Sequence, residues 1–214
     1  MTEFADLRAR MVERQLRGKG IEDERVLAAM GSVPREEFVP FRLRRRAYAD
    51  SALPIGAEQT ISQPWIVAAI CQALELRGDE RVLEVGTGSG YSACVLARLA
   101  AEVLSVERRE SLSRAADGAL AALGIGNVEL LVGDGSLGAP ERGPFDAIAV
   151  HAAAPAPPPA LLAQLADGGR MVVPVSAERG NGEILTLLRR HGEELRSEPI
   201  APCRFVPLLG AEGY

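Results

Sequence analysis

The second half of the chain alternates short apolar runs with amphipathic segments, and this alternation limits the fold more than any other feature. Five apolar runs are expected to form strands, at residues 81–85, 102–106, 128–132, 145–150 and 170–175. Three amphipathic segments are expected to form helices, at residues 89–99, 111–123 and 159–165. Repeated β–α units build a mainly parallel sheet covered by helices on both faces. The sequence therefore predicts an α/β protein with a doubly wound sheet.

Two extended runs follow residue 175 without a helix between them. They span Ile184–Arg189 and the stretch from Glu194 towards Pro207, and His191 with Gly192 lies at the turn. Strands joined by so short a turn pair antiparallel. We expect the sheet to end in a β-hairpin, with His191 exposed at its tip.

Residues 1–80 lack this alternation. Apolar residues near helical spacing predict a first helix that ends at Gly18 and Gly20, and a second short helix is expected at about Asp23 to Met30. Loops and short turns are expected between Phe38 and Ile55, where no period is sustained. We interpret residues 1–80 as a helical extension that carries an acceptor-site segment, and residues 81–214 as the core, together forming one compact domain.

The arginines of the irregular stretch form a local cluster at Arg42, Arg44, Arg45 and Arg46. A solvated surface is the favoured interpretation of this cluster, ahead of a binding patch. The 214-residue chain has a formal net charge of −5, so no overall field attracts nucleic acid or anionic lipid. Neither class of partner is expected.

The cysteines and the N-terminal residues favour a cytoplasmic protein. Cys71, Cys94 and Cys203 are odd in number and widely spaced, which is typical of reduced core thiols. Charges throughout Met1–Arg17 argue against a secretory signal, and prolines interrupt the longest uncharged run, Ala147–Ala166. No membrane span and no metal site are expected.

A glycine-rich turn follows the first predicted strand of the core. Gly86, Gly88 and Gly90 form a G-x-G-x-G loop that opens a helix, and Glu107 lies at the end of the next strand. Glycines allow a sharp turn and close approach of a ligand, while a carboxylate at that strand end can accept hydrogen bonds from ribose hydroxyls. On spacing alone this pair suits NAD or S-adenosylmethionine.

Three features favour S-adenosylmethionine over NAD. The loop lacks the G-x-G-x-x-G form that places a pyrophosphate at a helix N-terminus. It also begins about eighty residues into the chain, whereas dinucleotide domains often start with that strand. Asp134, between Gly133 and Gly135 after the third strand, could accept a hydrogen bond from an adenine amino group, with a simple turn role as the alternative. A nicotinamide oxidoreductase remains the rival at the level of the cofactor.

At this point the sequence resembles the protein-L-isoaspartate O-methyltransferase family. The most specific part is Gln59-Thr60-Ile61-Ser62-Gln63-Pro64, which follows Leu53-Pro54-Ile55-Gly56. Further similar blocks are Val33-Pro34-Arg35, Phe38-Val39-Pro40, Ala152-Ala153-Ala154-Pro155 and Arg204-Phe205-Val206-Pro207-Leu208. The resemblance covers nearly the whole chain and implies a Rossmann-like methyltransferase fold.

The resemblance implies an activity and a set of site residues. The activity is methylation of the free carboxylate of L-isoaspartyl residues in peptides and proteins, giving S-adenosylhomocysteine and an ester that collapses to a succinimide. Ser62 would be the catalytic serine, and its alternative role is a helix N-cap before Pro64. The expected substrate-binding residues are Thr60, Ile61, Gln63, His151, Arg204 and Val206. The expected cofactor-binding residues are Glu84, Gly86, Thr87, Gly88, Ser89, Glu107, Arg108, Asp134 and Gly135.

Two departures from the family leave alternatives open. Ala57-Glu58 replaces a glycine-containing pair, which would suit a non-catalytic binding module if the altered loop blocked the acceptor. His151 stands where many bacterial members have threonine; because it follows the fourth predicted strand at the ligand-binding edge, a site-lining role and a passive role both stay open. Amino-group methylation of nucleic acid is disfavoured, because the Asn/Asp-Pro-Pro-aromatic motif of such enzymes is missing at His151–Ala154. The runner-up is methylation of an ordinary aspartate in a dedicated precursor peptide of a natural product.

Overall fold

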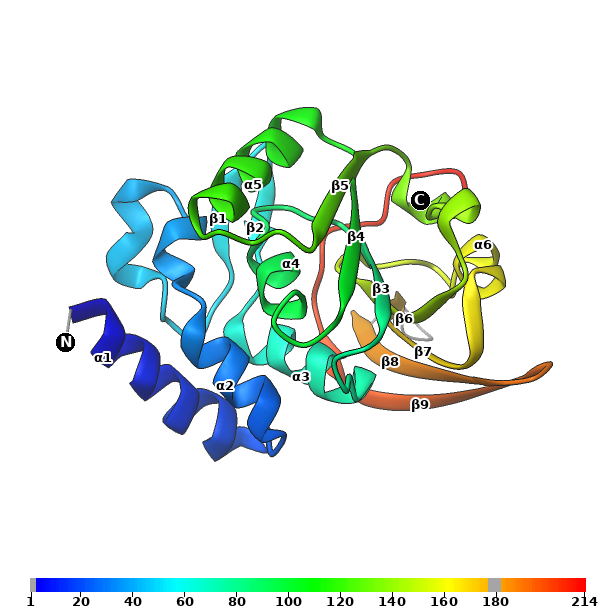
Figure 1. The fold of residues 1–214 in the computed structure, drawn as a ribbon, viewed down its shortest axis with the longest axis horizontal. Coiled ribbons are helices and arrows are strands. Elements are labelled where there is room, and N and C mark those ends of the chain that lie inside the picture. The colour runs from blue at the N-terminus through cyan, green and yellow to red at the C-terminus, as the bar shows by residue number, and fades with distance from the viewer. Residues whose placement is uncertain (1–2, 177–181) are drawn as a thin grey trace.

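The computed structural model describes residues 3–176 and 182–214, and a seven-stranded sheet forms its centre (Figure 1). The strand order is β5-β4-β3-β6-β7-β8-β9. These strands are β3 (Arg81–Val85), β4 (Glu102–Glu107), β5 (Val128–Val132), β6 (Phe145–Val150), β7 (Leu165–Ser176), β8 (Glu183–His191) and β9 (Glu194–Cys203). Strands β3 to β7 pair in parallel, and β8 pairs antiparallel with both β7 and β9. The predicted doubly wound sheet with a terminal hairpin is confirmed.

The order of the strands reverses next to β3. The chain first runs outward from β3 to β4 and β5, then returns to place β6 on the other side of β3. In open α/β sheets, ligands bind outside the carboxyl ends of the strands at such a reversal point. The fold therefore indicates a ligand site at the carboxyl ends of β3 and β6.

Both faces of the sheet are buried, as expected for a parallel sheet with helices on each side. Val82 and Val103 belong to one hydrophobic cluster, whereas the neighbouring residues Leu83 and Leu104 belong to the other. The first cluster includes residues of α3 (Pro64–Leu74), α4 (Tyr91–Leu96) and α5 (Glu110–Ala122). The second includes Leu161 of α6 (Pro159–Ala163). Alternation of side chains along each strand thus builds two cores.

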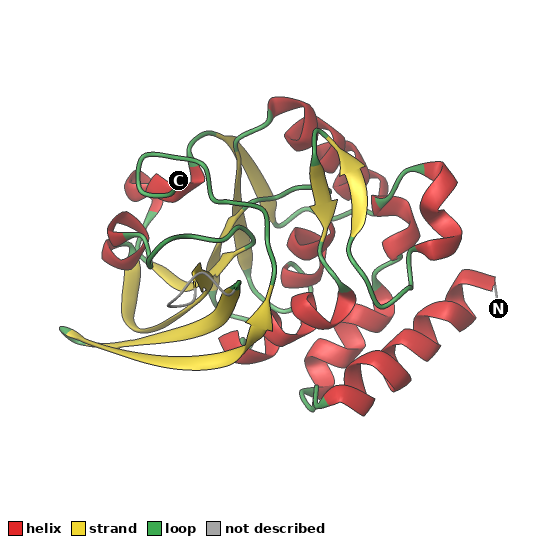
Figure 2. Cartoon of the chain, turned by 180° about the vertical axis from the view of Figure 1, so that it is seen from behind, coloured by secondary structure: helices red, strands yellow, loops and turns green. Residues whose placement is uncertain are grey.

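The N-terminal residues form helices beside the sheet (Figure 2). Helix α1 (Glu3–Arg10) continues through a π-helical turn and a 3₁₀ turn to Gly20, whose φ of 89° ends the run. Helix α2 (Glu24–Ser32) begins after Asp23, whose carboxylate accepts hydrogen bonds from two backbone N–H groups of the first turn. Both predicted helices are confirmed, and their apolar faces join the first cluster.

The stretch expected to be loop contains more order than predicted. Two 3₁₀ turns, Arg35–Phe38 and Phe41–Arg46, precede a separate two-stranded sheet made of β1 (Leu53–Gly56) and β2 (Gln59–Ile61). Short strands escape period analysis, and the turn between them, Ala57–Glu58, has positive φ angles of 49° and 59° where glycine is usual. The arginine cluster of residues 42–46 lies on the surface, as the solvated interpretation predicts.

Several helix and strand ends differ from the sequence predictions, among them those of α4, α6 and β7. Helix α4 is shorter than residues 89–99, because Ser89 and Gly90 stay in the turn that precedes it. Strand β7 starts at Leu165 rather than Arg170, at the end of a shortened α6. In the described parts of the chain, no helix combines the length and the apolar character needed to cross a membrane.

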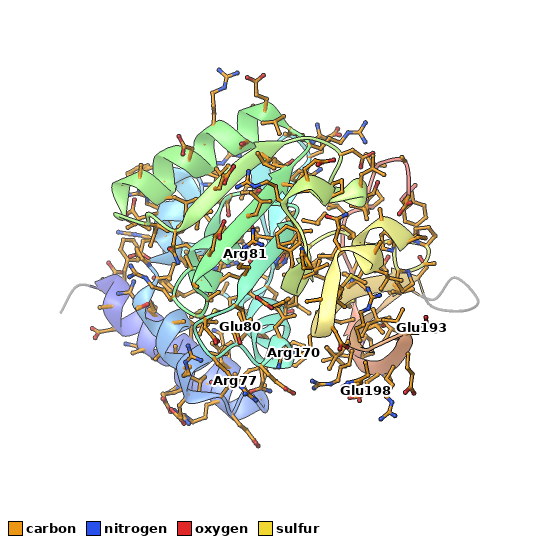
Figure 3. The ribbon with its side chains drawn as sticks, turned by 45° about the vertical axis from the view of Figure 1, so that its right-hand side comes forward. Arg77, Glu80, Arg81, Arg170, Glu193 and Glu198 are labelled. Carbon is orange, nitrogen blue, oxygen red and sulfur yellow. The ribbon has the colours of Figure 1, made fainter. Side chains whose placement is uncertain are left out.

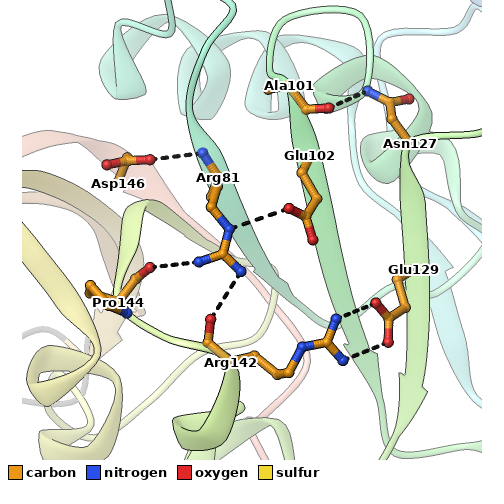
Figure 4. Close-up of polar contacts among 8 residues, drawn as sticks. All are labelled: Arg81, Ala101, Glu102, Asn127, Glu129, Arg142, Pro144 and Asp146. Atoms are coloured by element: carbon orange, nitrogen blue, oxygen red, sulfur yellow. Dashed lines mark hydrogen bonds and ion pairs between the residues drawn. The ribbon is translucent and has the colours of Figure 1, made fainter.

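Paired polar groups occupy the amino ends of the strands, opposite the reversal-point edge (Figure 4). The Arg81 guanidinium donates to Glu102 Oε2 at 3.3 Å and to the carbonyls of Arg142 and Pro144. Its backbone N–H donates to the carboxylate of Asp146 at 2.8 Å. Figure 3 shows Arg77, Glu80, Arg81 and Arg170 along this same side of the molecule.

Candidate active site

A cavity opens at the carboxyl ends of β3, β4 and β6. Four segments surround it: the glycine loop, the turn after β4, the end of β2 with the residues that follow, and the C-terminal stretch after β9. Its lining comprises Gln59, Thr60, Ile61, Ser62, Val67, Val85, Gly86, Thr87, Gly88, Ser89, Tyr91, Ser92, Val106, Glu107, Arg108, Arg109, Gly135, His151, Ala152, Val206, Pro207, Leu208 and Leu209. The sequence thus brings together the predicted cofactor loop and the predicted acceptor segment.

Two glycines show why this edge excludes larger residues. Gly90 has a φ of 86°, and a Cβ there would lie 3.0 Å from the Cβ of Ala116 in α5. A Cβ on Gly135 would lie 2.6 Å from Cγ1 of Val85. Glycine at position 90 lets the loop turn with a positive φ close against α5, and glycine at position 135 lets the segment after β5 lie against the end of β3.

Glu107 lines the cavity with its carboxylate already oriented. Oε2 accepts the Gly88 N–H at 2.9 Å, and Oε1 accepts the Arg109 N–H at 2.9 Å. Each carboxylate oxygen has further acceptor capacity. The side chain is largely buried yet reaches the cavity, so it can accept a pair of hydroxyl donors such as those of a ribose. The glycine cradle and this acceptor suit an adenosine-containing ligand.

Glu84 does not reach the cavity, which corrects the prediction that it binds the cofactor. Its side chain is fully buried inside β3 and accepts a hydrogen bond from Ser105 Oγ. The Ser105 hydroxyl in turn lies within hydrogen-bond distance of Thr87 Oγ1. Burial raises the pKa of the Glu84 carboxyl to about 7. Glu84 therefore supports the glycine loop from beneath and cannot contact a ligand directly.

His151 follows β6 and lines the cavity beside Gly86. Its Nε2 lies 2.7 Å from Ser92 Oγ and 3.4 Å from Glu84 Oε1. The imidazole is almost fully buried, and this burial lowers the pKa of His151 to about 4. The ring is consequently neutral at physiological pH, and its hydrogen bond with Ser92 fixes its orientation.

Asp134 contacts the C-terminal segment, and of the predicted pair only Gly135 lines the cavity. Asp134 Oδ1 accepts hydrogen bonds from the Ser136 N–H and hydroxyl, and Asp134 Oδ2 accepts one from the Ala211 N–H at 2.8 Å. A contact to adenine would have to use the remaining acceptor capacity of Oδ2. The turn role that the sequence left open as the alternative for Asp134 is thus present in the structure.

Ser62 lies between β2 and α3 on the cavity wall. Helix α3 has Gln63 at its N-cap position and Pro64 in its first turn, so the alternative role of Ser62 as the cap is wrong. Among the described residues no group hydrogen-bonds to the Ser62 hydroxyl, which is not buried. The Gln63 amide instead points to Asp50, donating to Oδ1 at 2.6 Å, and Gln63 is absent from the cavity lining.

The C-terminal stretch after β9 forms the remaining wall. Ala153 N–H donates to the Val206 carbonyl at 2.8 Å, and Leu208 N–H donates to the Ala153 carbonyl at 2.7 Å. Val206 lines the cavity, as predicted, whereas Arg204 does not. These bonds hold an extended segment beside the end of β6, where it can meet an extended ligand.

Several cavity residues were not singled out from the sequence. Tyr91 and Ser92 belong to the first turn of α4, and the position directly after the glycine loop is the signal that could have indicated them. Arg109 could have been inferred from its place next to Arg108 after β4. Gln59 belongs to the segment that carries the family resemblance, which could have indicated it, whereas Leu209 carries no comparable signal.

The parallel sheet, the glycine cradle at its reversal point and the carboxylate after the neighbouring strand define a Rossmann-like methyltransferase. Comparison with known proteins gives the particular family. The family model described as protein-L-isoaspartate(D-aspartate) O-methyltransferase matches residues 8–213. The chain belongs to this family.

Relatives of known name span nearly the whole chain. Protein-L-isoaspartate O-methyltransferase 1 of Rhodopseudomonas palustris (strain HaA2) is 54% identical over 213 residues, covering 100% of this chain and 87% of the relative. Protein-L-isoaspartate O-methyltransferase of Methylorubrum populi is also 54% identical, covering 100% of this chain and 99% of the relative. A solved protein-L-isoaspartate O-methyltransferase structure matches with a TM-score of 0.85 at 30% identity, covering 96% of this chain and 67% of that one. A Plasmodium falciparum structure in complex with S-adenosyl-L-homocysteine shares the fold, with a TM-score of 0.81 at 23% identity and coverage of 98% and 99%.

Proposed function

We propose that this protein transfers a methyl group from S-adenosylmethionine to the free α-carboxylate of L-isoaspartyl residues in peptides and proteins. The resulting ester collapses to a succinimide, which starts the return to normal aspartate. Membership of the family and high identity to enzymes named for this reaction support the proposal. The observation that carries it is the accessible Ser62 hydroxyl, which shares one cavity with the glycine loop and Glu107.

The cofactor end suits S-adenosylmethionine. Backbone of Gly86, Thr87, Gly88 and Ser89 would surround its methionine portion, and Glu107 would accept the ribose hydroxyls. Arg108 and Gly135, with the remaining acceptor capacity of Asp134, would hold the adenine. When bound, S-adenosylmethionine supplies an electrophilic methyl group on a sulfonium, and S-adenosylhomocysteine is the product. The described residues contain no grouping suited to a metal ion.

The acceptor end needs to bind and orient a carboxylate. An α-carboxylate is ionised at neutral pH, so no general base has to remove a proton. Ser62 Oγ would donate a hydrogen bond to one carboxylate oxygen and leave the other free to react. Closure of Thr60, Ile61 and Val206 around the acceptor would exclude water, which strengthens this interaction and holds the reacting atoms in line.

The peptide chain of the substrate would lie along the C-terminal wall. Backbone groups of the segment Arg204–Leu208 are proposed to bind it in an extended form, so that recognition depends little on side chains. Arg204 and Gln63 lie outside the cavity and would contact only flanking parts of a long substrate. His151, neutral and fixed by Ser92, would form an uncharged wall on the acceptor side.

Damaged proteins in the cytoplasm are the proposed substrates. Cys71 and Cys94 are buried free thiols, which is typical of proteins in a reducing compartment. We regard residues 1–80 as an extension that supplies the acceptor segment to the core of residues 81–214. Repair is preferred over methylation of a dedicated precursor peptide, because relatives across the full length are named for isoaspartate.

Mass spectrometry of methyl transfer tests the proposal. The purified protein is incubated with S-adenosylmethionine and a synthetic isoaspartyl peptide, and a second reaction omits the cofactor. We expect a mass gain of one methylene unit, followed by appearance of the succinimide. Failure to methylate the peptide, while S-adenosylmethionine binds normally in calorimetry, would contradict the proposed acceptor but not the cofactor.

A further inference from the structure

Arg35 is a buried cation without an anionic partner. Its side chain is completely inaccessible, and among the described residues no carboxylate forms an ion pair with it. Nε donates to the Ala47 carbonyl at 2.7 Å, and Nη2 donates to the Ser62 carbonyl at 2.7 Å. The remaining terminal nitrogen, Nη1, is buried without a hydrogen-bond partner. The guanidinium also lies over the Tyr91 ring, with 4.7 Å from its central carbon to the ring centroid.

This arrangement costs more than an apolar core residue would. Taking an unpaired charge out of water carries a large free-energy penalty, and two carbonyls with one aromatic face offset only part of it. Burial accordingly lowers the pKa of the Arg35 guanidinium. An apolar side chain of similar size would fill the same volume without that penalty. The contacts that Arg35 makes therefore matter more than the space that it fills.

Those contacts join three segments, two of which line the cavity. Ala47 ends the second 3₁₀ turn, Ser62 lies on the acceptor wall, and Tyr91 begins the helix after the glycine loop. The Ser62 carbonyl precedes α3 and follows β2, so the strand pairing and the helix both leave it without a partner. Arg35 supplies that partner and ties it to the first residue of α4.

We propose that Arg35 is the positioning residue of the acceptor site, fixing the backbone at Ser62 relative to the helix that follows the cofactor loop. This role rests on the proposed function, in which the Ser62 hydroxyl orients the acceptor carboxylate. The planar guanidinium uses two different nitrogens for two carbonyls while its face packs on Tyr91, and one ammonium group cannot reproduce that geometry. Arg35 touches neither substrate nor cofactor, because it does not line the cavity.

The test combines kinetics with hydrogen exchange on Arg35→Met and Arg35→Lys. Misplacement of a reacting group by about 1 Å costs about a hundredfold in rate, so Arg35→Met should lose about that in kcat on an isoaspartyl peptide. Arg35→Lys should keep less than about a tenth of the wild-type kcat. The Kd for S-adenosylmethionine should change by less than about twofold in both, because the cofactor wall is not altered. Amide exchange at residues 60–66 of the ligand-free protein should accelerate by about tenfold or more in Arg35→Met.

Tyr48→Phe is the matched control. It removes the Tyr48 hydroxyl, which donates to Glu36 and accepts from Arg8, but leaves both Arg35 bonds intact. Its kcat and its exchange at residues 60–66 should stay within about twofold of wild type.

The proposal is wrong if Arg35→Met keeps turnover and exchange within that range, or if Tyr48→Phe loses as much kcat as Arg35→Met. If Arg35→Met does not fold, kcat and amide exchange of Arg35→Lys test the proposal in its place. Absence of methyl transfer by the wild type would defeat the proposed function, whereas hydrogen exchange would still report on Arg35.

Discussion

Arg81 and Arg35 lie near opposite ends of the strands, Arg81 at the amino ends (the amino edge) and Arg35 beside the carboxyl ends (the carboxyl edge). Their positive charges have different partners. At the amino edge Arg81 is partly exposed and meets Glu102, two carbonyls and, through its backbone, Asp146 (Figure 4). At the carboxyl side Arg35 is fully buried, has no carboxylate partner and leaves one nitrogen unsatisfied. Pairing at the amino edge holds strand ends together, whereas unpaired groups at the other edge hold an active site in place.

Strained backbone and an unsatisfied carboxylate oxygen near the cavity show the same contrast. Ala57 and Glu58 adopt left-handed conformations in the hairpin that delivers Thr60 and Ser62, which costs of order 1 kcal/mol each. Glu84 keeps one buried oxygen without a hydrogen-bond partner. Proteins retain such costs where the structure around them serves binding or catalysis. The comparison predicts that substitutions at the carboxyl edge affect activity and those at the amino edge affect only stability.

The largest expected effect is that of Ser62→Ala. Loss of the one hydrogen-bond donor to the acceptor should lower kcat by about tenfold to a thousandfold, while the Kd for S-adenosylmethionine stays within about twofold. Steady-state kinetics on an isoaspartyl peptide and calorimetry measure the two quantities. Ser32→Ala, which removes only a hydroxyl bonded to the Ala29 carbonyl, is the control and should keep full turnover. Turnover of Ser62→Ala within about twofold of wild type would exclude this role for the hydroxyl.

Glu107→Ala should have the next largest effect, on cofactor binding. Loss of charge-assisted hydrogen bonds to the ribose should weaken S-adenosylmethionine binding by about 1 to 3 kcal/mol in calorimetry. Glu102→Ala, at the amino end of the same strand, should leave the Kd unchanged. An unaltered Kd in Glu107→Ala, or equal losses in the two variants, would remove the distinction between the two edges.

Glu84→Gln should change how stability depends on pH. Burial raises the pKa of Glu84 from 4.5 to about 7, so between these values the folded protein binds more protons than the unfolded chain. The wild type therefore loses stability as pH rises from about 4.5 to 7, by up to about 3 kcal/mol from this group. Burial lowers the pKa of His151, which makes an opposite contribution present in both proteins. Urea unfolding should show Glu84→Gln gaining stability relative to wild type between pH 5 and pH 8, and a constant difference would contradict this origin.

Arg142→Ala should have the smallest effect. Its guanidinium pairs with both carboxylate oxygens of Glu129 at the exposed amino edge, where water and salt screen the pair so that it contributes little to stability. Urea unfolding should therefore show only a small loss of stability, and kcat and cofactor affinity should not change. A loss of activity beyond about twofold would mean that the two edges are coupled.

The sequence predicted most of the fold because the strands of the core are long apolar runs with clear ends. It also predicted the place of Glu107 beside the glycine loop, since the last residue of a parallel strand lies at the edge of the sheet where ligands bind. Glu84, inside a strand buried on both faces, was assigned to the cofactor because a motif does not tell which way a side chain points. The β1–β2 hairpin was not foreseen, because its strands are too short to show a period and its turn, Ala57–Glu58, lacks the usual glycine. The environment of Arg35 was not foreseen, because it depends on contacts between segments far apart in the chain.

Paired peptides test the central claim, that the carboxyl edge is built to accept an isoaspartyl carboxylate. An isoaspartyl residue adds one methylene to the main chain and presents its free carboxylate on a shorter stem than aspartate does. A wall that fixes the peptide backbone then places only one of the two carboxylates in line with the methyl group. Initial rates on several unrelated peptide pairs should favour the isoaspartyl member by at least about a hundredfold, with little effect of flanking side chains. Equal rates within each pair, or activity confined to one partner peptide with ordinary aspartate, would contradict the account and favour a peptide-maturation enzyme.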